Sequence, residues 1–276
     1  MSAGEKARTE SAAPLPLLQA RDLRKTFAAG GGVSRAARRI VAVDGVSLEL
    51  AAGETLAIVG ESGSGKTTLT RMLVRLEEPD SGTIHFDGAD LLAARGAGLR
   101  ALRREMQVVF QDPYASLDPR LSVEAQVSEP LAIHQPQLSR GARRARVVEA
   151  LEAVGLGAEV LARYPHEFSG GQRQRIGIAR ALVLRPKLVV ADEPVSALDV
   201  SVGAQILALL AQLQSTYALT YLIVSHSLPV VAQLAARIAV MQAGRIVEVG
   251  AAEQILERPA HPYTQALVAA VPALPA

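Results

Sequence analysis

Residues 60–67 read G-E-S-G-S-G-K-T, and this stretch limits the possible folds more than any other part of the chain. It directly follows an apolar run, Thr55–Val59, and opens a helical pattern over residues 66–76. Glycines let backbone N–H groups turn inward around phosphate oxygens, and the helix N-terminus adds positive potential. Strand, loop and helix in this order predict an α/β fold that binds the phosphates of a nucleoside triphosphate.

The triphosphate is expected to be Mg-ATP, and its contacts are expected to come from the loop itself. Lys66 can reach the β- and γ-phosphates, and the Thr67 hydroxyl can ligate Mg²⁺. The alternative is a loop that is merely flexible because of its glycines, and the flanking strand and helix count against it. The predicted phosphate-binding residues are Gly60, Glu61, Ser62, Gly63, Ser64, Gly65, Lys66, Thr67 and Thr68.

A second stretch, L-V-V-A-D-E at residues 188–193, reads as an apolar strand that ends in two carboxylates. Two acids at the end of a buried strand are costly unless they serve a cation or a proton. Asp192 suits Mg²⁺, usually through water, and Glu193 suits polarisation of the water that attacks the γ-phosphate. Helix capping is the alternative role for acids in this position.

A third stretch, F-S-G-G-Q at residues 168–172, opens a predicted helix over residues 170–184. Ser169 can cap that helix, which would be a sufficient role by itself, or it can contact a phosphate. A second loop of this kind on one chain raises the question of whose phosphate it binds. The candidate contacts are Ser169, Gly170, Gly171 and Gln172.

The N-terminal part of the chain predicts an antiparallel unit. Its Gly-rich, Arg-bearing stretch at residues 28–39 is expected to be a hairpin loop, or simply a solvated run of charge. The strands expected to alternate in the antiparallel style cover residues 17–27, 41–43, 46–50 and 55–59.

The remainder predicts an α/β domain interrupted by helices. Two more strands are expected at residues 83–86 and 106–110, and residues 113–168 predict a helical insertion. Strands then alternate with helices, which predicts a parallel sheet covered on both faces. The later strands cover residues 188–191, 220–224, 239–241 and 245–249, and the later helices cover 170–184, 202–213 and a segment after Leu228.

Composition excludes several classes of function. The 276 residues contain no Cys, so disulfides, thiolate metal sites and thiol nucleophiles are excluded. The formal net charge is only +2, which is too small to indicate a nucleic-acid partner. The N-terminus lacks the apolar core of a secretory signal, and no stretch approaches the length of a membrane span. Any membrane role is therefore expected to come through partners.

The motifs together, with F-S-G-G-Q-R-Q-R at 168–175 and D-E-P-V-S-A-L-D-V-S at 192–201, resemble the ATP-binding subunit of an ABC transporter. The resemblance covers residues 17–270 and implies a P-loop NTPase core with a mixed or parallel sheet, an antiparallel β subdomain and a helical insertion. In that family residues 169–172, here called the signature loop, cap the γ-phosphate held by the opposite subunit. A two-fold dimer that sandwiches two ATP molecules is implied.

Four further positions follow from the resemblance, and three of them have a plainer alternative. Gln111 matches a glutamine that senses Mg²⁺ and the attacking water, or is a polar residue at a strand end. His226 matches the switch histidine that contacts the γ-phosphate, or is structural. Asp199 matches an aspartate that crosses the dimer interface. Phe27 matches an adenine-stacking aromatic, or belongs to the core of an edge strand.

Two strings narrow the subfamily to the ATPases of oligopeptide, dipeptide and nickel importers. These strings are Q-D-P-Y-A-S-L-D-P-R at 111–120 and H-P-Y-T-Q-A-L at 261–267. Phe168 stands where that family usually has Leu, and Ser227 follows His226 where Asp is usual. The tail ends at Ala276 without a cysteine-bearing extension, so no iron–sulfur cluster is expected.

The resemblance implies three kinds of partner: a second ABC ATPase in a homo- or heterodimer, integral membrane permease subunits and, indirectly, an extracytoplasmic solute-binding protein. Nucleic acid is not among them. The expected location is peripheral, on the cytoplasmic face of the inner membrane. The ATPase domain is expected over residues 17–270, with its helical subdomain at about 113–168 and tails at 1–16 (disordered) and 271–276.

ATP is expected to close the dimer, because both faces contact the same γ-phosphates, and hydrolysis is expected to open it. Three other functions are possible for such a chain. An ABC ATPase acting on DNA or ribosomes usually carries a long coiled coil or two nucleotide domains. A regulatory module without hydrolysis would lack Glu193 or His226. An exporter is disfavoured by the importer-like strings.

Overall fold

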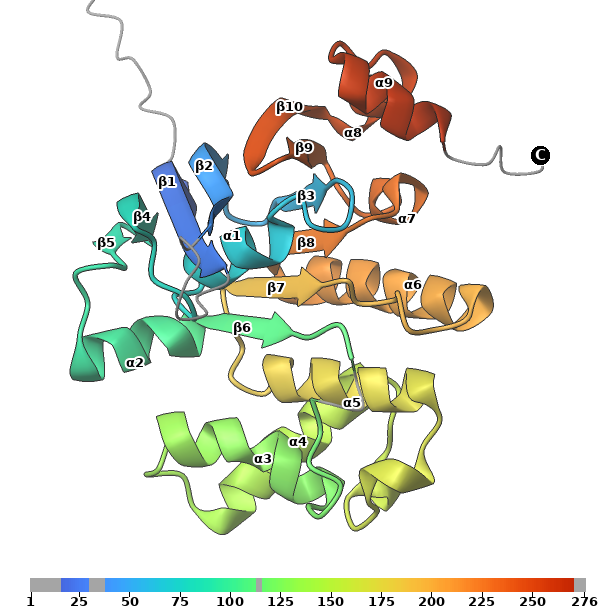
Figure 1. The fold of residues 1–276 in the computed structure, drawn as a ribbon. Coiled ribbons are helices and arrows are strands. Elements are labelled where there is room, and N and C mark those ends of the chain that lie inside the picture. The colour runs from blue at the N-terminus through green and yellow to red at the C-terminus, as the bar shows by residue number, and fades with distance from the viewer. Residues whose placement is uncertain (1–15, 30–37, 113–115, 271–276) are drawn as a thin grey trace, which may run out of the picture.

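The computed structural model describes residues 16–29, 38–112 and 116–270, and contains two sheets with helices on their faces and at one end (Figure 1). The predicted tails at 1–16 and 271–276 lie outside the described residues, apart from residue 16. Most of the predicted loop at 28–39 does as well. The α/β class with a mixed sheet and an antiparallel sheet is confirmed.

The central sheet has six strands in the order β10-β9-β3-β8-β7-β6. The pairs from β9 to β6 are parallel, and β10 is antiparallel to β9. Parallel neighbours end at one edge of the sheet, so the residues that follow these strands are brought together. The strands are β3 (Thr55–Val59), β6 (Met106–Val109), β7 (Leu188–Asp192), β8 (Thr220–Ser225), β9 (Arg237–Gln242) and β10 (Arg245–Ala251).

The prediction that residues 55–59 continue an antiparallel unit was wrong. β3 pairs in parallel with both β8 and β9 at the centre of the sheet. All five of its residues are buried, and alternate side chains enter two different cores: Leu56 and Ile58 one, Ala57 and Val59 the other. The continuous apolar run is typical of a strand covered on both faces, which distinguishes it from an alternating antiparallel strand.

The second sheet is antiparallel, in the order β2-β1-β4-β5. Residues 41–43 and 46–50 were predicted as two strands, and they form one, because Gly45 at φ +68° provides a bulge that the pairing passes through. Both β1 and β2 also extend into the predicted loop, and they pair as the hairpin predicts. The strands are β1 (Leu18–Ala29), β2 (Arg38–Leu50), β4 (Ser81–Phe86) and β5 (Ala89–Asp90).

Helices cover both faces of the central sheet. Helix α1 packs with the antiparallel sheet on one face, while α5, α6 and α7 pack on the other. The prediction that α1 reaches residue 76 was wrong, because Arg75 adopts a left-handed conformation at φ +53° and ends the helix early. Residues 123–182 are here called the helical segment. The helices outside it are α1 (Lys66–Leu73), α2 (Gly96–Glu105), α6 (Val200–Tyr217), α7 (Leu228–Ala232), α8 (Ala252–Glu257) and α9 (Pro262–Ala269).

The predicted helical insertion contains two α-helices that pack against α5, at the lower end of Figure 1. Ser122, Ser139 and Ser169 cap the three helices, since each hydroxyl accepts a bond from a backbone N–H in the first turn. No helix in the described part of the chain has the length and apolarity needed to cross a membrane. The elements are α3 (Val123–His134), α4 (Arg140–Ala153), η1 (Ala158–Val160), η2 (Pro165–Glu167) and α5 (Gly170–Leu182).

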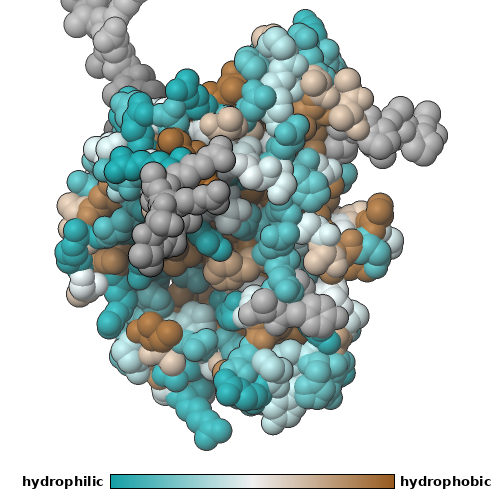
Figure 2. All heavy atoms as spheres, in the orientation of Figure 1, coloured by the Kyte–Doolittle hydropathy of each residue, from teal (hydrophilic) through white to brown (hydrophobic). Residues whose placement is uncertain are grey.

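A groove of about 300 Å³ lies between α3 and the region of β6. Figure 2 shows this face, which is hollowed between the α2–β6 region and α3 and carries hydrophobic side chains at the hollow. Three of the lining residues are large, apolar and about half exposed: Leu76, Phe110 and Ile133. Exposed apolar residues grouped around a groove indicate a surface for a partner.

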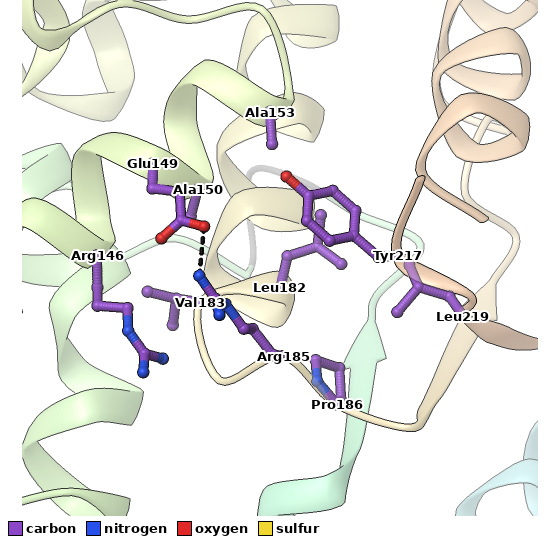
Figure 3. Close-up of a pocket in the computed structure, with 10 residues that line it drawn as sticks. All are labelled: Arg146, Glu149, Ala150, Ala153, Leu182, Val183, Arg185, Pro186, Tyr217 and Leu219. Atoms are coloured by element: carbon purple, nitrogen blue, oxygen red, sulfur yellow. Dashed lines mark hydrogen bonds and ion pairs between the residues drawn. The ribbon is translucent and has the colours of Figure 1, made fainter. Parts of the chain in front are cut away.

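A smaller cavity, of about 140 Å³, lies between α4, the end of α5 and the end of α6 (Figure 3). Tyr217 at the end of α6 and Leu182 at the end of α5 form its apolar walls. An ion pair closes one side, with Arg185 Nη2 2.5 Å from Glu149 Oε1. None of the predicted site residues lines it.

Candidate functional site

Residues 60–67, here called the phosphate loop, connect the end of β3 to the start of α1. Gly60 and Gly65 have φ values of +155° and +105°. A Cβ atom on Gly60 would lie 2.1 Å from the Met241 carbonyl oxygen, and one on Gly65 would lie 2.1 Å from the Ala42 carbonyl oxygen. The loop is therefore held between β9 and β2 so closely that only glycine fits at these two positions.

Lys66 is the buried cation of this loop. Its Nζ donates to the carbonyl oxygens of Gly60 at 2.7 Å and Glu61 at 2.8 Å. Burial lowers the pKa of Lys66, although the charges of Glu193, Asp192 and Glu61 oppose the shift. An ammonium that is desolvated and bound mainly by neutral carbonyls favours an anionic ligand, which a phosphate oxygen provides.

Asp192 ends β7 and places one of its carboxylate oxygens in a buried position. Among the described residues, its Oδ1 atom is buried without a hydrogen bond. Desolvation raises the pKa of Asp192, and so does the charge of Glu193, while Arg71 and Lys66 oppose the shift. An unpaired buried carboxylate oxygen is costly, so it fits a site for a cation.

The three predicted metal-site residues line one cavity: Thr67 at the start of α1, Gln111 after β6, and Asp192. Their side chains offer hydroxyl, amide and carboxylate oxygens, the donors that Mg²⁺ prefers when substrate phosphates and water complete its shell. Within the described part of the chain, no group of three or more His, Cys, Asp or Glu side chains is placed to hold a metal ion. The donor set thus fits Mg²⁺ bound together with a nucleotide.

Gln111, Glu193 and His226 converge at the edge of the sheet. Gln111 Nε2 donates to Glu193 Oε2 at 3.0 Å, and His226 Nδ1 lies 3.2 Å from Glu193 Oε1. The three residues follow β6, β7 and β8, which are adjacent parallel strands. The three strands end beside the phosphate loop. Gln111, Glu193 and His226 therefore line one cavity of about 570 Å³ together with Lys66 and Thr67. A carboxylate held by an amide and an imidazole in this cavity is placed to orient a water molecule.

The signature loop is satisfied within its own helix. Ser169 Oγ accepts from the Gln172 N–H at 3.3 Å, and Gln172 Oε1 accepts from the Ser169 N–H at 3.1 Å. This capping box confirms the structural role predicted for Ser169. No residue of the signature loop lines the cavity at the phosphate loop, so one chain does not bring the two loops together.

Asp199 lies beside the signature loop. Its Oδ1 accepts from the Val202 N–H at 2.9 Å and caps α6. A Cβ atom on Gly171 would lie only 2.4 Å from Val202 Cγ1, so the first turns of α5 and α6 are in close contact. The next residue, Val200, is 92% exposed. Asp199 and the signature loop therefore share one exposed edge, on which Val200 is an uncovered apolar side chain.

The adenine-stacking prediction for Phe27 has no direct support in the geometry. The ring is 40% exposed and lies under Lys25, whose Nζ is 5.4 Å from the ring centre. Phe27 does not line the cavity at the phosphate loop, but Ile40, its register partner on β2, and Val41 do. Sequence reasoning missed these two residues, and two adjacent apolar residues after a basic run were the available signal.

The two departures from the family pattern fit their surroundings. Phe168 is buried, with the Arg163 guanidinium 4.3 Å from the centre of its ring. Ser227 N–H donates to Ser225 Oγ at 3.0 Å, so the turn after His226 is hydrogen-bonded without an acid at position 227.

Sequence reasoning also missed a contact to the phosphate loop from the C-terminal segment. The Glu61 N–H donates to the Tyr263 hydroxyl oxygen at 3.1 Å. Tyr263 belongs to the H-P-Y-T string, which had indicated a subfamily and no contact.

Comparisons with known proteins find relatives over most of the chain. Residues 43–196 match the family model described as ABC transporter, and residues 247–276 match the oligopeptide/dipeptide transporter C-terminal region. The glutathione import ATP-binding protein GsiA of Pectobacterium atrosepticum is 50% identical over 93% of this chain, which spans 41% of that protein. The dipeptide transport ATP-binding protein DppF of Escherichia coli K12 is 49% identical over 94% of this chain and 77% of its own length. The ATP-binding cassette MJ0796, in a dimeric post-hydrolysis state bound to ADP and Pi, superposes with a TM-score of 0.75 at 30% identity, covering 85% of this chain and 98% of that one.

Proposed function

The chain belongs to the ABC transporter family and is an ATPase, and from this premise we propose that it powers the import of peptides, nickel or a related solute through a membrane permease. The observation that carries the solute class is the match of residues 247–276 to the oligopeptide/dipeptide transporter C-terminal region. The names of the relatives, a dipeptide transport and a glutathione import ATP-binding protein, support the same class.

Binding of ATP begins at the phosphate loop. Lys66 exchanges its bonds to the Gly60 and Glu61 carbonyls for phosphate oxygens, and the loop N–H groups surround the β-phosphate. Thr67, Gln111 and Asp192 would hold Mg²⁺, which supplies charge neutralisation of the phosphates when bound. Ile40 and Val41 provide apolar surface beside the loop.

Hydrolysis depends on the carboxylate of Glu193. It orients and polarises the water that attacks the γ-phosphate, and it is itself held by Gln111 Nε2 and His226 Nδ1. His226 is also close enough to Glu193 to report the state of the γ-phosphate to α7, which begins two residues later. Three neighbouring strands thus each contribute one residue to the reacting end of the nucleotide.

The site is completed by a second ATPase subunit, a copy of this chain or a homologue. The signature loop and Asp199 lie on an exposed edge, away from the phosphate loop of their own chain. The dimeric state of the cassette MJ0796 supports this arrangement. ATP held between two subunits favours the closed dimer, and hydrolysis removes the shared ligand.

The permease docks in the groove between α3 and β6, through a helix on its cytoplasmic side. The lining comes from two parts of the chain, with Ile133 on α3 of the helical insertion and Phe110 next to Gln111 at the nucleotide site. Closure around ATP would change the spacing of these walls and so move the docked helix. The chain then works at the cytoplasmic face of the inner membrane, with an extracytoplasmic solute-binding protein delivering the solute to the permease.

Affinity purification of the full chain from membranes tests the assignment. We expect a permease pair and a second ATPase to co-purify, and the associated binding protein to bind peptide or nickel. ATP-dependent solute uptake into vesicles should disappear with Lys66→Ala and remain with Glu253→Gln, an exposed control on α8. Recovery with DNA or ribosomes, and without a permease, would contradict the proposal.

A further inference from the structure

The peptide unit that joins Gly60 to Glu61 is held at both ends. Its carbonyl oxygen accepts from Lys66 Nζ at 2.7 Å, and its N–H donates to the Tyr263 hydroxyl oxygen at 3.1 Å. The N–H and C=O of a trans peptide point in opposite directions within one plane. Tyr263 and Lys66 therefore fix the same plane from its two sides, at the entry to the phosphate loop.

Tyr263 is itself fixed by bonds within the C-terminal segment. The Glu248 carboxylate accepts from the N–H groups of Ala260 at 2.8 Å and His261 at 3.0 Å. His261 Nδ1 then accepts from the Tyr263 N–H at 3.1 Å at the start of α9. Tyr263 and Leu267 pack against the core under the sheet. A chain of hydrogen bonds thus runs from β10 through the H-P-Y-T turn to the phosphate loop.

We propose that Tyr263 is a positioning residue for ATP binding, and that the C-terminal segment sets nucleotide affinity through the Gly60–Glu61 peptide. Without the phenol oxygen the plane of this peptide is less constrained, because Glu61 is exposed and, among the described residues, the hydrogen bond that remains is the one from Lys66 to the Gly60 carbonyl. Lys66 must leave that carbonyl to reach the phosphates. A plane kept in place by Tyr263 preserves the shape of the loop while Lys66 changes partners, which lowers the reorganisation needed on binding.

The alternative is a purely structural role, in which Tyr263 only anchors α9 to the core. An anchor affects the stability of the fold and the fraction of folded protein, whereas a positioning residue affects the affinity for ATP at unchanged stability. The apolar ring supplies the anchoring and the phenol oxygen supplies the bond to Glu61, so Tyr263→Phe separates the two roles.

The test compares Tyr263→Phe with Tyr217→Phe in the full chain. Tyr217 is 40% exposed and lies far from the phosphate loop, in the walls of the small cavity at the end of α6, so it controls for loss of a phenol oxygen. Titration with Mg-ATP should show the Kd, and the KM of hydrolysis, raised about fivefold by Tyr263→Phe, because the loop must then be ordered when the nucleotide binds. The kcat and the unfolding temperature should stay at the wild-type values, and Tyr217→Phe should change nothing.

A second pair of variants tests the chain of bonds behind Tyr263. His261→Ala removes the acceptor for the Tyr263 N–H and should raise the KM, while His261→Asp supplies a capping oxygen and should restore it. Unchanged Kd and KM in Tyr263→Phe, or equal effects of Ala and Asp at position 261, would overturn the proposal. Because the inference rests on ATP binding by this chain, wild-type protein that fails to bind Mg-ATP would instead contradict the function proposed above.

Discussion

The phosphate loop and the signature loop are both glycine-bearing turns at the start of a helix, but they differ in how far one chain satisfies them. The signature loop closes its own capping box between Ser169 and Gln172. Beside the phosphate loop, Asp192 Oδ1 is buried and has no hydrogen bond from the residues that the structure describes. The surroundings of the phosphate loop leave a polar group for a ligand to satisfy, whereas the signature loop satisfies its own backbone and, in our proposal, meets a ligand held by another chain.

Charge makes the same distinction. Burial lowers the pKa of Lys66 and raises that of Asp192, so both groups are less easily charged than in water. The signature loop carries no charged side chain, and Ser169 and Gln172 cap each other's backbone N–H groups. Unfavourable electrostatics that a nucleotide with its Mg²⁺ relieves are therefore concentrated around the phosphate loop.

The largest expected effect is at the phosphate-loop side. Glu193→Gln keeps the shape of the side chain and removes the base, so turnover should fall by about 10²- to 10⁴-fold while ATP affinity is retained. Steady-state phosphate release and an ATP titration on the same sample measure the two quantities. Glu253→Gln is the matched control, and turnover at the wild-type rate in Glu193→Gln would remove Glu193 from its role.

The next effect separates capping from phosphate contact at the signature loop. Aspartate caps helices as well as serine does, but its charge opposes a nearby phosphate. Ser169→Asp should therefore leave the unfolding temperature and the ATP affinity of the single subunit unchanged, and lower ATPase activity by about 100-fold. Full activity in Ser169→Asp would leave Ser169 with a capping role alone.

The smallest effect is on the unfolding temperature, and its sign differs between Asp192, beside the phosphate loop, and Ser169, in the signature loop. Asp192→Asn removes an unpaired buried charge and should raise the unfolding temperature by about 2 °C at neutral pH, while Ser169→Ala should lower it by a similar amount. Because the folded-state pKa of Asp192 is raised, the cost of its charge is absent below the ordinary carboxyl pKa of 3.8 and complete above the raised pKa. The gain from Asp192→Asn should therefore appear as the pH rises through that window. A gain that does not vary with pH would contradict this origin.

Two parts of the site could be predicted from the sequence: the continuous motif, and the residues that follow parallel strands. The phosphate loop is a continuous motif, and Gln111, Glu193 and His226 each follow an apolar strand, so the parallel sheet brings them together. The contact between Tyr263 and Glu61 joins residues 202 positions apart and depends on how the C-terminal segment folds back. No pattern of either segment predicts it.

The errors have physical causes as well. β3 was assigned to the antiparallel unit because it follows β2 after a short turn, although its continuous apolar run indicated burial on both faces. The end of α1 depends on the left-handed conformation of Arg75. Arginine has no preference that would predict this conformation from the sequence. The adenine-stacking role of Phe27 stays a prediction made from its residue type, and the cavity has Ile40 and Val41 on its wall.

The central claim is that the phosphate loop is half of a site that a second subunit completes, and the mass of the protein in solution tests it most directly. Two samples are compared: the Glu193→Gln chain alone, and the same chain mixed with the ATPase that co-purifies with it. Without nucleotide, the Glu193→Gln chain should be monomeric at 29.0 kDa in both samples. With saturating Mg-ATP, light scattering should show the mass of two subunits, and adding Ser169→Asp to the same chain should abolish the dimer. If the mass stays at that of one subunit in both samples while ATP is demonstrably bound, the account is contradicted.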